Sequence, residues 1–319
     1  MVRLSGDVRR SLIDDQTIGK DTAWSSEKTN EILQMANRLY EGKDLETHFA
    51  GMIAAHDGDA WAWIQARIRA GDFRGINVGD FIQFEADGNN YKAEIAGINT
   101  YKDYGDAGHV VGNHVDFITR DCHPTPFVWN RANYNNGTSV SPNPWLASDL
   151  YARLNSLQMN VPNSVTANPA MVNADYRNTG ILNTLPSALR NVIVEKRVLA
   201  SFRFTAGSLL VEDNMWYWGN IGRLWLPSEI EVYGRRERGV SSHPNRNFSS
   251  SGFQQYPIFA NNMRHVKNKS EGGERTPWWL ITPQGNDSSS VCSVCSTGIA
   301  VSGSAGSLHV RVPLCFRIA

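Results

Sequence analysis

Cysteine is scarce in this sequence, with four residues among 319, at positions 122, 292, 295 and 315. So few and so unevenly spaced thiols exclude a disulfide scaffold. Cys292 and Cys295 have the CxxC spacing of zinc and redox sites, but SVCSVCST alternates as a strand does, and residues three apart in a strand face opposite sides. A zinc site would need a second ligand pair, for which Cys122, His123 and Cys315 are only scattered candidates. We therefore expect ordinary thiols, no metal site and no cofactor.

Long apolar runs and an excess of one charge are also lacking. No run approaches the roughly 20 residues of a membrane helix, and the segment MVRLSGDVRRSLIDDQ lacks the apolar centre of a signal peptide. Acidic and basic residues number 31 each, which removes any global electrostatic case for binding nucleic acid or an anionic membrane. We expect a soluble protein that neither inserts into a membrane, nor binds nucleic acid, nor leaves the cell by the general secretory route.

Motifs of common enzymes are missing as well. The chain has no GxSxG, no HExxH, no Walker loop and no GxGxxG before a helix. His109, His114 and Asp116 fit no compact metal-ligand spacing. Glu229 and Glu231 are predicted to share one face of a strand, but no second wall or pocket is visible for acid and base catalysis. We expect no catalytic residues and no enzyme activity.

The patterns that are present predict an α+β fold with short strands and long loops. Helical spacing occurs near residues 25–42, 56–73, 144–158 and 185–198, and Gly71 is a natural helix stop. Alternation on both sides of DGNN predicts a hairpin within 76–101, and further strands are expected at 109–121, 290–296, 298–302 and 307–319. We assign 1–71 to an N-terminal helical attachment or oligomerisation segment and 72–319 to one domain.

Ten tryptophans and a serine-rich C-terminal segment are the most unusual features. The run SSSVCSVCSTGIAVSGSAGS comes closely after Trp278 and Trp279. Small hydrogen-bonding side chains beside rigid aromatic anchors are typical of a binding surface. The alternative is a hairpin at the edge of a sheet whose serine-rich outer face is only solvated.

The order of several motifs resembles a family of phage and prophage proteins. These motifs are GDFIQF…YKAEIAGINTYKDYGD, WLASDLYARLNS, WLPSEIEVYG, QQYPIF and WWLITP…STGIAVS…VRVPLCFRI, and they extend from about Ile76 to the end. Members of the family resemble C-type-lectin-like proteins, and some are similar to variable proteins of diversity-generating retroelements. The N-terminal segment resembles parts of phage tail and fibre proteins. This chain departs from the family in having Ile281 where an arginine is usual, and in the spacing of Arg311 and Pro313.

The resemblance implies a C-type-lectin-like domain whose variable region covers about 278–319. Adenine-directed diversification cannot produce Trp, Met, Lys, Gln or Glu, and residues 285–319 contain none of them, whereas the whole-chain composition would predict roughly five. Trp278 and Trp279 are expected chiefly as the scaffold beneath the ligand-binding face. The other residues expected on that face are Asn286, Asp287, Ser288, Ser289, Ser290, Ser293, Ser302, Ser304, Ser307 and His309.

Three functions are compared on this basis. The first is a phage virion protein for receptor binding and host attachment, made in the bacterial cytoplasm and carried on the virion surface as part of a head or tail fibre. It would bind a bacterial surface receptor, protein or glycan, contact other virion proteins through residues 1–71, and form a homo-oligomer such as a trimer. The second is a structural head or tail decoration protein. The third is an enzyme similar to formylglycine-generating oxidases, with Cys292 and Cys295 as candidates, and it is the least favoured.

Overall fold

The computed structural model describes most of the chain after the first 40 residues. It describes residues 41–106, 108–131, 133–136, 144–159, 174–200, 204–205, 211–212, 217–238, 254–262, 264–285 and 287–319. The chain divides into two compact units, Met1–Glu41 and Gly42–Ala319. The helix expected near 25–42 lies almost wholly outside the described residues, whereas the second unit contains nearly all of them.

Three helices open this second unit: α3 (Leu45–His48), α4 (Ala50–Ala54) and α5 (Ala60–Ala70). The α5 helix confirms the prediction for 56–73. Asp59 caps its first turn by accepting the N–H groups of Trp61 and Ala62, and Gly71 ends it with a φ of 66° that favours glycine. The helix buries Trp61 and Ile64 in the same core as the central sheet, so the expected boundary at residue 71 falls inside this unit.

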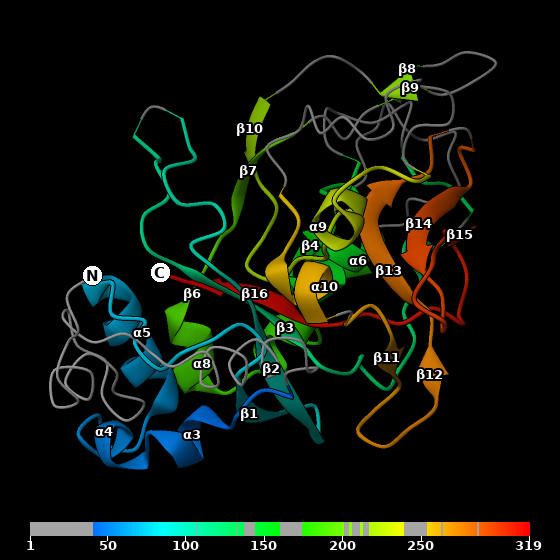
Figure 1. Ribbon diagram of the computed structural model, residues 1–319. Coiled ribbons are helices and arrows are strands. Elements are labelled where there is room, and N and C mark those ends of the chain that lie inside the picture. The colour runs from blue at the N-terminus through cyan, green and yellow to red at the C-terminus, as the bar shows by residue number, and fades with distance from the viewer. Residues whose placement is uncertain are drawn as a thin grey trace, which may run out of the picture. The chain divides into compact units, whose positions relative to one another are not determined.

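The central sheet is antiparallel and has five strands in the order β1-β2-β3-β16-β6. Its strands are β1 (Phe81–Ala86), β2 (Asn89–Ile98), β3 (Val115–Thr119), β6 (Ile193–Val194) and β16 (Cys315–Ile318). Asp87 and Gly88, with φ of 51° and 68°, form the turn between β1 and β2 and confirm the predicted hairpin. The C-terminal strand lies inside the sheet, between two strands from earlier parts of the chain (Figure 1).

An aromatic cluster joins α5 to this sheet. Phe117 and Phe316 are cross-strand partners whose rings stack with centroids 5.2 Å apart. The ring of Trp61 lies edge-on to Phe316 at 5.9 Å. Edge-to-face and offset contacts of this kind stabilise a core beyond simple burial.

Short elements occupy the middle of the chain. The helices are α6 (Asp149–Leu154), α7 (Ile181–Thr184), α8 (Ser187–Val192), α9 (Glu229–Tyr233) and α10 (Pro257–Asn262). Four two-stranded ladders pair β4 (Gln158–Met159) with β5 (Ala174–Asp175), β7 (Arg197–Ala200) with β10 (Tyr217–Asn220), β8 (Phe204–Thr205) with β9 (Val211–Glu212), and β11 (Lys267–Asn268) with β12 (Arg275–Thr276). The unit is therefore α+β with short strands, as expected.

The expectation that Glu229 and Glu231 share a strand face is wrong, because both belong to helix α9. Ser228 accepts the N–H of Glu231, and the Glu231 carboxylate accepts the N–H of Ser228, which is a complete capping box. The alternation of Ile230 and Val232 favoured a strand, but the reciprocal cap fixes a helical first turn.

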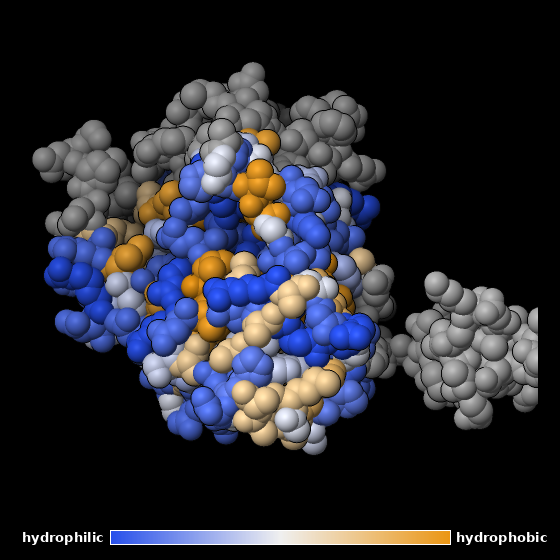
Figure 2. Space-filling view, turned by 90° about the vertical axis from the view of Figure 1, so that its left-hand side faces the viewer, coloured by the Kyte–Doolittle hydropathy of each residue, from blue (hydrophilic) through white to orange (hydrophobic). Residues whose placement is uncertain are grey.

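One face of the molecule shows how apolar side chains are distributed. Figure 2 shows that hydrophobic residues on this face form small, separate patches among hydrophilic residues. Scattered apolar surface of this kind is normal for a folded domain and does not by itself mark a binding site. Within the described part of the chain, no helix has the length and apolar character needed to cross a membrane.

Candidate binding surface

A second antiparallel sheet carries half of the predicted binding residues. It consists of β13 (Trp278–Pro283), β14 (Ser290–Val294) and β15 (Ala300–Ser304), in that order. Strand β14 confirms the expectation for 290–296. The strand expected at 298–302 is present but begins two residues later, as β15, and the run 307–319 is a strand only over Cys315–Ile318.

Trp278 and Trp279 are adjacent residues of strand β13, and both are fully buried. The indole N–H of Trp278 donates to the carbonyl of His265 at 2.8 Å, and that of Trp279 donates to the carbonyl of Phe127 at 2.8 Å. A Cβ atom added at Gly303 would lie 3.2 Å from the Trp279 ring, so the β15 backbone packs directly on that ring. Both tryptophans hold the sheet in place and are not available to a ligand.

The predicted polar residues differ in exposure. Those that are exposed are Ser288, Ser302 and His309. Those that are half-buried are Asp287, Ser289, Ser290, Ser304 and Ser307. Ser293 is only 2% exposed, because it lies between Trp279 and Val301 in the ladder, so we leave it out of the binding surface. Asn286 lies outside the described residues.

The turn between β13 and β14 is held by its own hydrogen bonds. Asp287 Oδ1 accepts the N–H of Ser289 at 2.8 Å and its hydroxyl at 2.7 Å, while Oδ2 accepts the hydroxyl of Ser290 at 2.7 Å. Partial burial would raise the pKa of Asp287, but these hydrogen bonds outweigh it and the pKa is lowered. The carboxylate therefore stays ionised and orders the serines around it.

Asn133 and Asn135, from a loop distant in the sequence, form hydrogen bonds with the turn and with strand β15. The Asn135 amide donates to the carbonyls of Asp287 and Ser290, both at 2.7 Å, and the Asn135 N–H donates to the carbonyl of Ser288 at 2.8 Å. Asn133 accepts the Ser304 hydroxyl and the N–H of residue 306. The sequence patterns did not single out either asparagine, since only an asparagine-rich composition marked this loop. Their contacts make the turn rigid before any ligand arrives.

A pocket of about 520 Å³ lies at the start of β15. Its lining includes Tyr233, Arg235, Glu237, His265, Ile299 and Ala300. The Tyr233 and His265 rings stack with centroids 5.3 Å apart, and the Tyr233 hydroxyl donates to the carbonyl of Gly298 at 3.1 Å. Arg235 and Glu237 form an ion pair. The volume falls in the range of small-molecule sites.

The two cysteines of the CxxC motif have different environments. Cys292 is fully buried, and burial, reinforced by nearby Glu229, raises the pKa of its thiol well above the ordinary value. Cys295 is partly exposed; desolvation would raise its thiol pKa, but hydrogen bonds, chiefly from Thr297, lower it. In the described ranges, no group of three or more His, Cys, Asp and Glu side chains could hold a metal ion.

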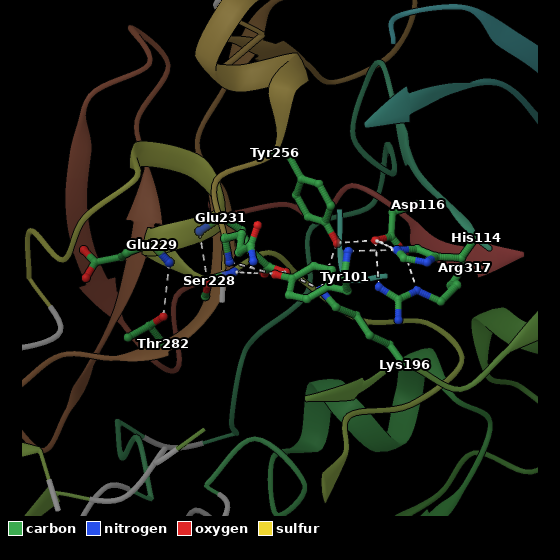
Figure 3. Close-up of polar contacts among 11 residues, drawn as sticks. Tyr101, His114, Asp116, Lys196, Ser228, Glu229, Glu231, Tyr256, Thr282 and Arg317 are labelled. Atoms are coloured by element: carbon green, nitrogen blue, oxygen red, sulfur yellow. Dashed lines mark hydrogen bonds and ion pairs between the residues drawn. The ribbon is translucent and has the colours of Figure 1, made fainter. Parts of the chain in front are cut away.

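A buried polar cluster fixes helix α9 to the central sheet (Figure 3). Its members are Tyr101, His114, Asp116, Lys196, Glu231, Tyr256 and Arg317, all of them buried. Arg317 donates two hydrogen bonds to Asp116, at 2.7 and 2.8 Å, and the Tyr256 hydroxyl donates to the same carboxylate at 2.8 Å. Lys196 pairs with Glu231, and Tyr101 donates to Glu231 at 2.6 Å.

Charges within this buried polar cluster balance, with two cations and two carboxylates. Burial alone would raise the pKa of Asp116, but the Arg317 charge and its hydrogen bonds lower it. Burial lowers the pKa of Lys196, and the Glu231 charge opposes that effect. Because α9 supplies both Glu231 of the cluster and Tyr233 of the pocket, the cluster positions the pocket relative to the central sheet.

The first prediction concerns His114, whose ring accepts the N–H of Tyr101 at 3.1 Å and shares a hydrogen bond with the Gly112 carbonyl at 2.9 Å. Burial lowers the pKa of His114 from 6.5 to about 4. Between pH 6.5 and pH 4 the unfolded chain binds a proton at this histidine that the folded chain does not bind. The free energy of unfolding is therefore highest above pH 6.5, as far as His114 is concerned, and it falls as the pH is lowered toward 4. We expect the free energy of unfolding to drop by about 2–3 kcal/mol from pH 7 to pH 4.5 through this residue.

Urea unfolding at pH 7, 5.5 and 4.5 measures this effect. His114→Gln keeps an acceptor for the Tyr101 N–H but cannot titrate, so its free energy of unfolding should depend less on pH. His309→Gln, at the exposed surface, is the matched control and should behave as the unmodified chain does. An equal pH dependence in His114→Gln and the unmodified chain would contradict the assignment.

Fold and surface together define an α+β domain in which a sheet with two buried tryptophans presents polar side chains at the surface. A family model described as a domain of unknown function, DUF6273, matches residues 128–318. This is more than half of the chain, and the chain belongs to this family. Searches of curated proteins and of solved structures found no match.

Proposed function

We propose that this chain is a phage virion protein that binds a bacterial surface receptor through the second sheet and its serine-rich turn. One observation carries the proposal: short polar side chains at the surface belong to a sheet and a turn whose first strand is held in the core by the buried side chains of Trp278 and Trp279. A rigid base lets surface side chains meet a ligand at little cost in conformational entropy. The same rigidity would let those side chains vary without loss of the fold.

The wider parts of the proposal come from the family resemblance. The domain would be C-type-lectin-like, residues 1–71 would attach it to other virion proteins as a homo-oligomer such as a trimer, and the assembly would lie on the virion surface. Several copies on one particle would turn weak single contacts into firm attachment through effective concentration. A head or tail decoration protein is the alternative, and it requires no binding to the host cell.

The second prediction tests receptor binding with two exposed residues. Ser288→Lys combined with His309→Lys places two long charged side chains on the proposed surface. We expect binding of the labelled full chain to cells of the phage host to weaken by at least about tenfold, since changes at interface anchors are costly. Flow cytometry of the cells measures the change.

A matched control carries the same added charge elsewhere. Ser187→Lys combined with Asn191→Lys changes two exposed positions of helix α8, outside residues 1–71, and should leave cell binding within about twofold of the unmodified chain. Both double variants should unfold at the same urea concentration as the unmodified chain. Equal binding by the two double variants, or no binding by the unmodified chain, would favour the decoration protein.

A further inference from the structure

Strand β15 is the outer strand of the second sheet, and among the described strands it pairs with β14 alone (Figure 1). The bond from the Cys295 N–H to the Ile299 carbonyl, at 3.0 Å, fixes which residues face β14. Antiparallel pairs alternate, so Val301 also faces β14, whereas Ala300 and Ser302 direct their N–H and C=O groups away from it.

These outward groups lack backbone partners within the described part of the chain. The strand sequence AVSGS has no charge and no proline, and all five residues are at least partly exposed. Natural sheets usually protect such edges with charged side chains, proline or a bulge. An unprotected edge of this kind can accept an added strand.

The pocket begins where this edge begins, because Ile299 and Ala300 form part of its lining. Alternate side chains of an added strand project to the same face of a sheet. A strand placed beside Ala300 would therefore direct a side chain toward the pocket. The two charged lining residues, Arg235 and Glu237, pair with each other, so the pocket favours an uncharged side chain.

The size of the pocket distinguishes between two kinds of added strand. A second copy of β15 would bring only Ala, Val, Ser and Gly side chains to the edge, and these would occupy much less of the pocket of about 520 Å³ than a large side chain would. We propose that β15 binds an extended peptide segment of a foreign protein by strand addition, with one large uncharged side chain of that segment in the pocket. The proposal rests on the receptor-binding function above and names the receptor class as protein.

One position separates strand addition from recognition by serine side chains. Ser302→Pro removes an outward N–H and obstructs an added strand, but it leaves the bonds of Val301 to β14 intact, as proline allows at an edge. Ser302→Ala removes only the hydroxyl. Peptides selected on the full chain from a random twelve-residue display library should bind Ser302→Pro at least about tenfold more weakly, and Ser302→Ala within about twofold.

Each outcome of this experiment decides the question. Amide exchange at Ala300 and Ser302 should slow on peptide binding, and the selected peptides should share a large uncharged residue. The proposal is overturned if no peptide can be selected, if both variants lose peptide affinity equally, or if Ser302→Pro binds the peptides as the unmodified chain does. It is also overturned if sedimentation shows that Ser302→Pro dissociates an oligomer paired through β15. If only the receptor-binding proposal is wrong, the full chain will not bind cells but will still bind the selected peptides.

Discussion

Replacing Arg317 by methionine should lower the free energy of unfolding by about 3–5 kcal/mol. The change leaves the Asp116 carboxylate buried and without the guanidinium that donates two hydrogen bonds to it. Taking a charge out of water is tolerated only while a partner compensates it, so removing one partner costs more than the intact pair contributes. Urea unfolding at pH 7 measures the loss.

An exposed ion pair is the matched control for this result. Arg74 pairs with Asp72, and its side chain is 90% exposed, so Arg74→Met should unfold at nearly the same urea concentration as the unmodified chain. The double variant Asp116→Leu with Arg317→Met should lose less than the sum of the two single variants, because no unpaired charge remains. A loss below about 1 kcal/mol for Arg317→Met would show that the buried pair of Arg317 and Asp116 does not stabilise the central sheet.

Trp279→Ala should destabilise the domain by about 3–5 kcal/mol, the ordinary cost of removing a large buried ring. The variant loses the packing against Gly303 and leaves the Phe127 carbonyl without its indole donor. Since this ring supports the candidate binding surface, ligand binding should fall together with stability. Chemical unfolding and cell binding, measured on the same preparations, test both effects.

Ser302, which precedes Gly303 on strand β15, provides the control variant for Trp279→Ala. Ser302→Ala should change the free energy of unfolding by no more than about 0.5 kcal/mol, because the side chain is exposed. Equal losses in Trp279→Ala and Ser302→Ala would contradict the division into a rigid base and a changeable surface.

Several local elements of this protein could be predicted from its sequence alone. The hairpin at Asp87 and Gly88, the helix between Asp59 and Gly71, and the alternation of β14 are all of this kind, because neighbouring residues supply the caps, turns and periodicity. The capping box at Ser228 was also present in the sequence, although alternation around Ile230 favoured the wrong element.

Contacts between residues that are far apart in the sequence are visible only in the tertiary structure, because no local pattern predicts them. Asp116 and Arg317 are 201 positions apart, and their contact depends on β16 pairing with β3 inside the central sheet. The burial of Ser293 and the contacts of Asn135 with the serine-rich turn likewise depend on segments that are far apart in the sequence. Local geometry comes from adjacent residues, whereas these contacts come from the burial and pairing of the whole domain.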